Sequence, residues 1–127
     1  MSVRYAVASS GDFRFDTEAL ISAMQVAFPG SEVRRPTGDL AAELAASVSL
    51  PTPPGRVRNM EVDILRGSGA IGIEGARTPE EVAEFVTWLA RTAPVPDDGS
   101  VVLIEWADDL VPLTPDVTAE HLLALRS

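Results

Sequence analysis

Apolar and polar residues alternate in several short stretches of this chain, which is the pattern of β-strands that bury one face. Four such stretches lie near residues 3–7, 32–35, 60–64 and 71–73. A fifth, Val101–Ile104, is apolar at every position, which predicts a central strand covered on both faces. We therefore expect a sheet of four or five strands.

The stretches near 60–64 and 71–73 are predicted to pair as a β-hairpin, with Gly67-Ser68-Gly69 as the turn. Gly67 to Gly72 also match the letters G-x-G-x-x-G of dinucleotide-binding loops. Such a loop requires a helix that opens within it, so that helix N–H groups meet the phosphates. The residues that follow alternate like a strand, so we interpret the motif as a hairpin turn.

Two helices have clear start signals. Asp16 is placed as the N-cap of the first, with Phe15 and Leu20 as a hydrophobic staple, and Pro29-Gly30 ends it. Thr78 followed by Pro79 starts the second. The predicted core stripes are Leu20, Ile21, Met24 and Phe28 in the first helix, and Val82, Phe85, Val86 and Leu89 in the second.

Two further helices are expected. The alanine-rich segment from Asp39 to Val48 repeats an apolar residue every fourth position, and alanine has the highest helix propensity. Thr118 is placed to cap a short last helix that carries Leu122. Residues 51–55, rich in proline, are expected to form an extended internal loop, because neither side of it is long enough for its own core.

These elements predict one α+β domain over residues 1–127. We expect a mostly antiparallel sheet with two or three helices packed on it, in the order β-α-β-(α)-β-β-α-β-α. No apolar stretch is long enough to span a bilayer or to form a signal-peptide core, so a cytoplasmic protein is expected.

Composition excludes several kinds of chemistry. The 127 residues include no cysteine, which rules out disulfides, thiolate metal sites and cysteine nucleophiles. All ten basic residues are arginines, so a lysine Schiff base or a phosphate-loop lysine is also excluded. No cofactor, metal ligand set or catalytic motif stands out, and the protein is not expected to be an enzyme.

The charge is unevenly distributed along the chain. The net charge is −9. Residues 1–77 hold nine acids and eight arginines, a net of −1, whereas residues 78–127 hold ten acids and two arginines, a net of −8. A surface with this excess repels nucleic acids and anionic membranes and attracts basic partners.

We therefore predict a surface that binds another, basic protein. It would use acids and aromatic residues of the last 50 positions, because aromatics bordered by charges are typical of interfaces. The predicted contact residues are Glu80, Glu81, Glu84, Trp88, Asp97, Asp98, Glu105, Trp106, Asp108 and Asp109. Glu105, Asp108 and Asp109 are alternatively a set of carboxylates for a divalent cation.

The remaining polar residues point to less specific roles. His121 is the only histidine, and no G-x-S-x-G motif accompanies it, so we expect a surface side chain rather than a catalytic one. The basic pairs Arg34-Arg35 and Arg56/Arg58 are expected to neutralise acids within the molecule or on a second subunit.

The size, acidity and mixed α+β order of this chain resemble those of the immunity proteins of bacterial polymorphic-toxin systems. The nearest local likeness is the tail, where the strand VVLIEW is followed by ADDLVPLTPDVTAEHL, an acidic turn and a threonine-capped helix. The resemblance implies a cytoplasmic inhibitor that covers the active site of a toxin, often a basic nuclease or deaminase. An acidic secretion chaperone and a small metal-dependent hydrolase are the alternatives, and the oligomeric state is left open.

Overall fold

The computed structural model describes residues 5–51, 60–67, 69–75, 78–93, 95–107 and 110–126, with the backbone alone at residue 40. The elements follow the chain in the order β1 (Tyr5–Ser9), α1 (Thr17–Ala27), β2 (Glu32–Arg34), the 3₁₀ turn η1 (Gly38–Ala42), β3 (Leu44–Ser49), β4 (Glu61–Leu65), β5 (Ala70–Glu74), α2 (Pro79–Thr92), β6 (Val101–Ile104), β7 (Val111–Pro112) and α3 (Ala119–Ala124).

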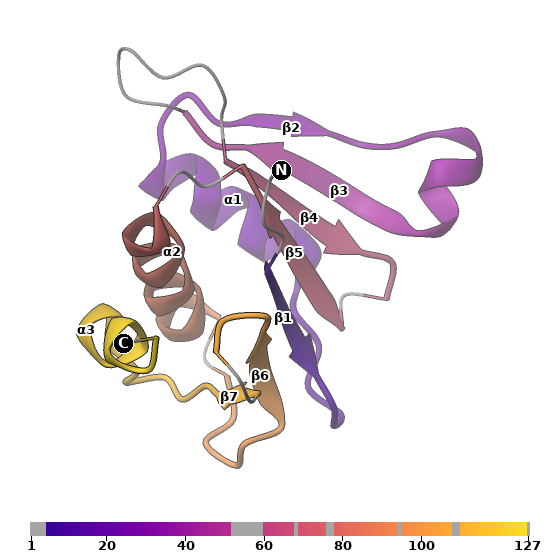
Figure 1. The fold of residues 1–127 in the computed structure, drawn as a ribbon. Helices are drawn as coiled ribbons and strands as arrows, with labels where there is room; N and C mark the ends of the chain where they lie inside the picture. Colours follow the sequence, from indigo (N-terminus) through magenta and orange to yellow (C-terminus); the bar gives the residue numbers. More distant parts are fainter. Residues whose placement is uncertain are drawn as a thin grey trace.

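The strands described form one sheet in the order β2-β3-β4-β5-β1-β6-β7, and every neighbouring pair is antiparallel (Figure 1). The predicted α+β class and the antiparallel sheet are therefore confirmed. The predicted hairpin is also confirmed: β4 pairs with β5, with Val62 opposite Ile73 and Ile64 opposite Ile71. Since β5 is a strand, the glycine motif does not open a helix.

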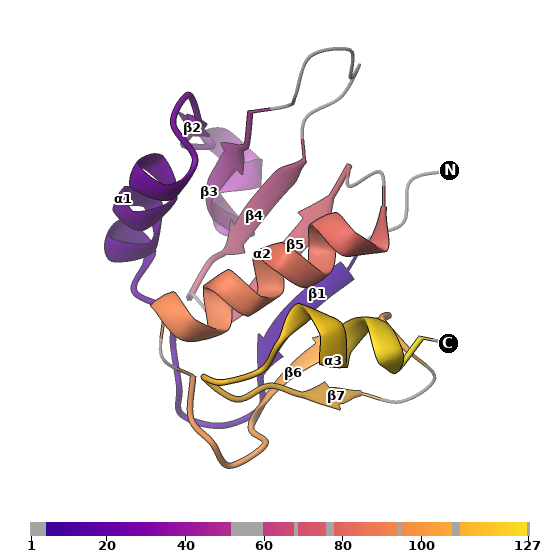
Figure 2. The same ribbon diagram turned by 90° about the vertical axis from the view of Figure 1, so that its left-hand side faces the viewer.

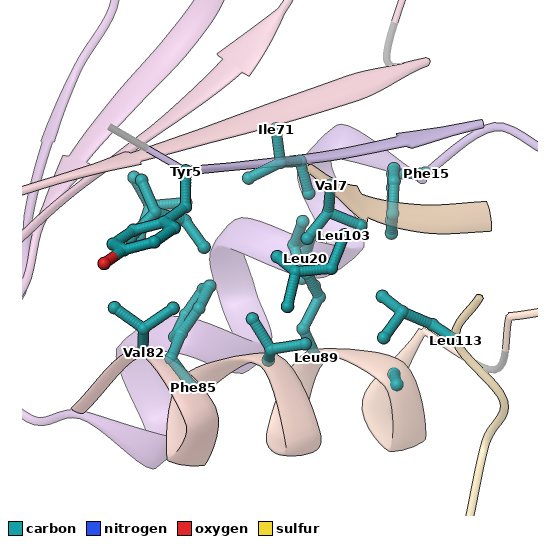
Figure 3. Packing of buried hydrophobic residues seen from close by; sticks show 14 of the residues in the cluster. Tyr5, Val7, Phe15, Leu20, Ile71, Val82, Phe85, Leu89, Leu103 and Leu113 are labelled. Carbon is teal, nitrogen blue, oxygen red and sulfur yellow. The ribbon is translucent and has the colours of Figure 1, made fainter. Parts of the chain in front are cut away.

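The three α-helices cover one face of the sheet, so the molecule has two layers (Figure 2). In the core between the layers, Val82, Phe85 and Leu89 of α2 point toward Tyr5 and Val7 of β1 (Figure 3). The predicted stripe of α2 is buried throughout. Burying each such large apolar side chain contributes about 1.5–3 kcal/mol, which makes this layer contact a main source of stability.

The predicted helix caps are present. The Asp16 carboxylate accepts a hydrogen bond from the Ala19 N–H at 3.1 Å, and the Thr78 hydroxyl accepts one from the Glu81 N–H at 3.3 Å. Thr118 accepts in the same way from the His121 N–H at 3.1 Å. Each cap satisfies an N–H group that the first turn of its helix leaves without an intrahelical partner.

The helix predicted from Asp39 to Val48 is wrong. Only Gly38–Ala42 form a 3₁₀ turn, and Leu44–Ser49 are strand β3, between β2 and β4. An apolar repeat of four is also consistent with a strand, and here Ala46, Val48 and Leu50 are the buried residues, two positions apart. Pairing with strands on both sides outweighs the helix propensity of alanine.

The predicted number of strands, four or five, is too low, because the described residues contain seven. The two additions are β3 and the two-residue edge strand β7. Val101–Ile104, predicted as central, is β6, next to that edge. Its Val101 and Leu103 are buried, but Val102 and Ile104 are only half-buried, because they lie on the sheet face without an α-helix.

Strand β4 is more buried than its alternating pattern predicts. Asp63, expected on the solvent side, is only 7% exposed. It lies opposite Ser47 of β3, whose hydroxyl donates a hydrogen bond to its carboxylate at 2.7 Å. A buried carboxylate needs such donors, because an unsatisfied charge in the interior is costly.

Most of the proline-rich loop predicted at 51–55 and the basic residues Arg56 and Arg58 lie outside the described residues. Among the helices that the structure describes, none is long and apolar enough to cross a membrane.

Candidate partner-binding surface

Two of the acidic segments meet at one end of the sheet. Strands β5 and β6 run in the same direction because both are antiparallel to β1. Their last residues, Glu74 and Ile104, therefore lie at the same end. Helix α2 begins shortly after β5, and Glu105 follows β6 directly, so the start of α2 lies at the same end as Glu105 (Figure 2). We call Glu80, Glu81, Glu84 and Glu105 the acidic end.

Most of the acidic end faces solvent. Glu80, Glu84 and Glu105 are exposed, and Glu81 is half-buried. Glu80 and Glu84 are one helical turn apart, so their carboxylates lie on the same side of α2. The positive end of the helix dipole offsets part of this negative charge in the first turn.

Asp97 and Asp98 do not belong to this surface. They precede β6, whereas Glu105 follows it, so the four-residue strand separates them by roughly 13 Å of chain. Their loop is fixed beside the end of β1, where the Ser10 N–H donates to the Ser100 carbonyl at 2.7 Å. Hydrogen bonds from Ser100 lower the pKa of Asp98, including one from its N–H at 2.9 Å.

Glu105 has an unusual backbone conformation. Its φ of 68° makes it the only residue other than glycine with positive φ among those described. This region is strained for residues with a Cβ, and it persists where surrounding contacts hold it. Here the neighbouring residue Trp106 supplies those contacts.

Trp106 is buried rather than exposed at a sheet edge, with 2% of its surface accessible. Its indole N–H donates to the Leu122 carbonyl of α3 at 2.7 Å. The Arg126 guanidinium lies 4.7 Å from the centre of its ring and donates to its carbonyl at 3.1 Å, and the Tyr5 ring is 5.6 Å away. Trp106 thus contributes no exposed contact surface; it fixes the chain between β6 and β7 to α3.

Trp88, the other predicted aromatic contact, is half-buried on α2. Its ring packs edge-on against Phe28 at 5.2 Å and lies 5.7 Å from Phe85. These rings join α2 to the end of α1. Its main contacts are therefore within the protein.

Asp108 and Asp109 lie outside the described residues, so their predicted role remains a prediction. The next residue, Leu110, is 59% exposed. Sequence analysis assigned Leu110 only to a brief extended segment. Its apolar character beside two acids was the available signal for an exposed contact, but the same residue is equally compatible with a strand.

The other candidate residues do not form a catalytic or metal site in the described part of the chain. No group of three histidine, aspartate or glutamate side chains close enough for a metal ion occurs there. The cation site proposed from Glu105, Asp108 and Asp109 includes undescribed residues. His121 is exposed in the first turn of α3, as predicted.

The arginines of the N-terminal part are paired with acids, as expected for Arg34 and Arg35. Arg34 forms an ion pair with Glu61 at 2.5 Å. Arg35 binds Glu18 through two hydrogen bonds of 2.8 Å, and this contact lowers the pKa of Glu18. Charge on this side of the molecule is thus partly neutralised internally.

Comparisons of this chain with protein-family models, with curated proteins and with solved structures found no match. The resemblance to immunity proteins therefore remains a prediction from the sequence.

Proposed function

We propose that this protein binds a basic protein through its acidic end and blocks that protein's activity, as an immunity protein neutralises a toxin. One observation carries the proposal: the acids of the two halves of the chain are treated differently. Glu18 and Glu61 are paired with arginines. Within the described residues, Glu80, Glu84 and Glu105 have no ion-pair or hydrogen-bond partner of their own, although all three are exposed.

Unpaired carboxylates at one end of a molecule create a local negative potential. Such a potential steers a cationic partner into encounter and raises the association rate, most strongly at low salt. The exposed Leu110, which follows the acidic turn, supplies an apolar contact of the kind that slows release once the partner is bound.

The test is affinity capture from a lysate of the native host with three baits. One bait is the unmodified protein. The second carries Glu80→Gln, Glu84→Gln and Glu105→Gln. The third carries Asp12→Asn, Asp39→Asn and Glu43→Gln, which removes three exposed acids elsewhere and gives the same net charge.

We expect the unmodified and third baits to retain the same basic protein at low salt and to lose it as salt rises. The second bait should retain much less, with an association rate lowered about tenfold when the isolated pair is measured. Equal retention by the second and third baits would place the contact surface elsewhere. Inhibition of the captured protein's activity by the unmodified bait then separates an inhibitor from a passive binder.

A further inference from the structure

A small pocket opens at the opposite end of the sheet from the acidic end. It has a volume of about 250 Å³ and lies between the β1–α1 connection, the first turn of α1 and the last residues of α2. At about 30 Å³ per water molecule, this space holds roughly eight waters. It therefore suits a ligand of the size of a single amino acid rather than a nucleotide.

The inner wall of the pocket is apolar. Leu20 is 2% exposed and belongs to the core, and Phe13 and Ala93 are partly buried and pack against it. The Phe13 ring is fixed by an edge-to-face contact with Phe15 at 5.0 Å. A wall of this kind favours an aliphatic or aromatic group and offers little to a wholly polar ligand.

The pocket also contains one guanidinium with unused donors. Arg14 Nη1 donates to the carbonyl oxygens of Gly11 at 2.8 Å and Phe13 at 2.7 Å, which holds the side chain in place. Among the described residues, its Nε and Nη2 have no acceptor. A positioned guanidinium with two free N–H groups matches a carboxylate, which accepts two parallel hydrogen bonds.

A carboxylate lines the same pocket. One oxygen of Asp16 accepts from the Ala19 N–H as the cap of α1, and the other oxygen has no partner among the described residues. Arg14 and Asp16 do not form an ion pair with each other within 4.0 Å. A simple anion would be attracted by Arg14 but repelled by Asp16, and a simple cation would meet the reverse.

We propose that the pocket binds a free apolar α-amino acid. Its carboxylate would pair with Arg14, its ammonium group with Asp16, and its side chain would lie against Leu20, Phe13 and Ala93. This ligand is the class of small molecule that matches both charges and the apolar wall together. The site is separate from the acidic end, so it does not depend on the proposed inhibition of a partner.

The test is a titration followed by ¹H–¹⁵N correlation spectra and calorimetry, with L-leucine and L-phenylalanine as probes. We expect saturable binding of at least one of them, with a Kd of about 1 mM or below, and peak shifts centred on residues 13–20 and 92–93. N-acetyl-L-leucine lacks the ammonium group and L-leucinamide lacks the carboxylate. Each should bind at least about tenfold more weakly than L-leucine, because a charged hydrogen-bonded contact is lost.

Four variants link the binding to the pocket. Arg14→Gln and Asp16→Asn should each weaken binding at least about tenfold, and asparagine preserves the helix cap so that the fold is kept. Arg91→Gln and Asp12→Asn remove the same charges from exposed residues that do not line the pocket, and they should bind like the unmodified protein. The proposal is overturned if neither amino acid binds, if the acetylated or amidated probe binds equally well, or if the control variants lose as much affinity as the pocket variants.

Discussion

Glu105 and Trp106 are adjacent in the chain but have opposite environments. Trp106 is inserted between Tyr5, Leu122 and Arg126, while Glu105 is exposed with a left-handed backbone. The inward turn of the tryptophan and the outward turn of the glutamate are parts of one local geometry. The position of the carboxylate therefore depends on a strained residue that is held by buried contacts.

Replacing Glu105 with glycine should stabilise the fold. Glycine adopts positive φ without the steric cost that a Cβ imposes, and this relief exceeds the entropy that glycine adds to the unfolded chain. We expect Glu105→Gly to raise the free energy of unfolding by about 0.5–1 kcal/mol in urea denaturation. Glu105→Ala removes the same carboxylate but keeps the Cβ, so equal effects of the two substitutions would contradict the strain argument.

The loop at Asp98 should make a pH-dependent contribution to stability. Hydrogen bonds from Ser100 lower the pKa of Asp98 in the folded protein. A carboxyl group whose folded pKa is lowered stabilises the fold above its unfolded pKa of about 3.9, and the contribution is lost as pH falls through the folded pKa. Ser100→Ala should therefore raise the pKa of Asp98 in an NMR titration and destabilise the protein at pH 6. A loss of stability that is the same at pH 6 and pH 3 would show that Ser100 acts through packing alone.

At the scale of elements, strong local signals predicted α1, α2, α3 and the β4–β5 hairpin, and weaker ones failed. The caps at Asp16, Thr78 and Thr118 are local, because each hydroxyl or carboxylate bonds an N–H three residues ahead. Strand β3 was missed because its alanines are good helix formers and its identity is decided by β2 and β4. Pairing partners distant in sequence leave no signal in a local pattern.

The same limit applies to the candidate site. The sequence identified the acids of α2 and Glu105, but not that strand direction separates them from Asp97 and Asp98. It identified Trp106 as a possible contact, whereas its indole N–H finds an acceptor on α3, sixteen residues later. The pocket at Arg14 was also missed, because it joins residues of α1 to the end of α2.

Helix α3 should depend on Trp106 for its attachment. Trp106→Phe removes the N–H that satisfies the Leu122 carbonyl, and it leaves space where the larger ring packed. We expect a loss of about 2 kcal/mol in the free energy of unfolding. Amide exchange in α3 should also become faster than in α1.

Trp88→Phe is the matched control for this substitution. Trp88 is half-buried, and its indole N–H has no hydrogen-bond partner among the described residues. Its replacement should cost less than about 1 kcal/mol and leave exchange in α3 unchanged. Similar losses for the two variants would indicate that ring volume, not the bond to Leu122, fixes the helix.

At the scale of the whole molecule, the fold concentrates charge instead of dispersing it. The antiparallel order places the ends of β5 and β6 together, and the acids that follow them have no arginine partner in the described residues. Ion pairs such as Arg35–Glu18 are exposed and contribute little to stability. The balance between the acidic end and the rest of the surface should therefore determine how stability responds to salt.

Added salt should stabilise the folded protein, because it screens repulsion among unpaired acids more than it weakens the few exposed pairs. We expect the free energy of unfolding to rise by up to about 1 kcal/mol between low and physiological ionic strength. The triple variant Glu80→Gln, Glu84→Gln, Glu105→Gln should show a smaller rise than Asp12→Asn, Asp39→Asn, Glu43→Gln. Both change the net charge from −9 to −6 by removing three acids. Because total charge is equal, a difference between them measures the clustering itself; parallel salt dependences would mean that the acids of the acidic end do not act as one charged surface, which would also remove the basis for steering a basic partner.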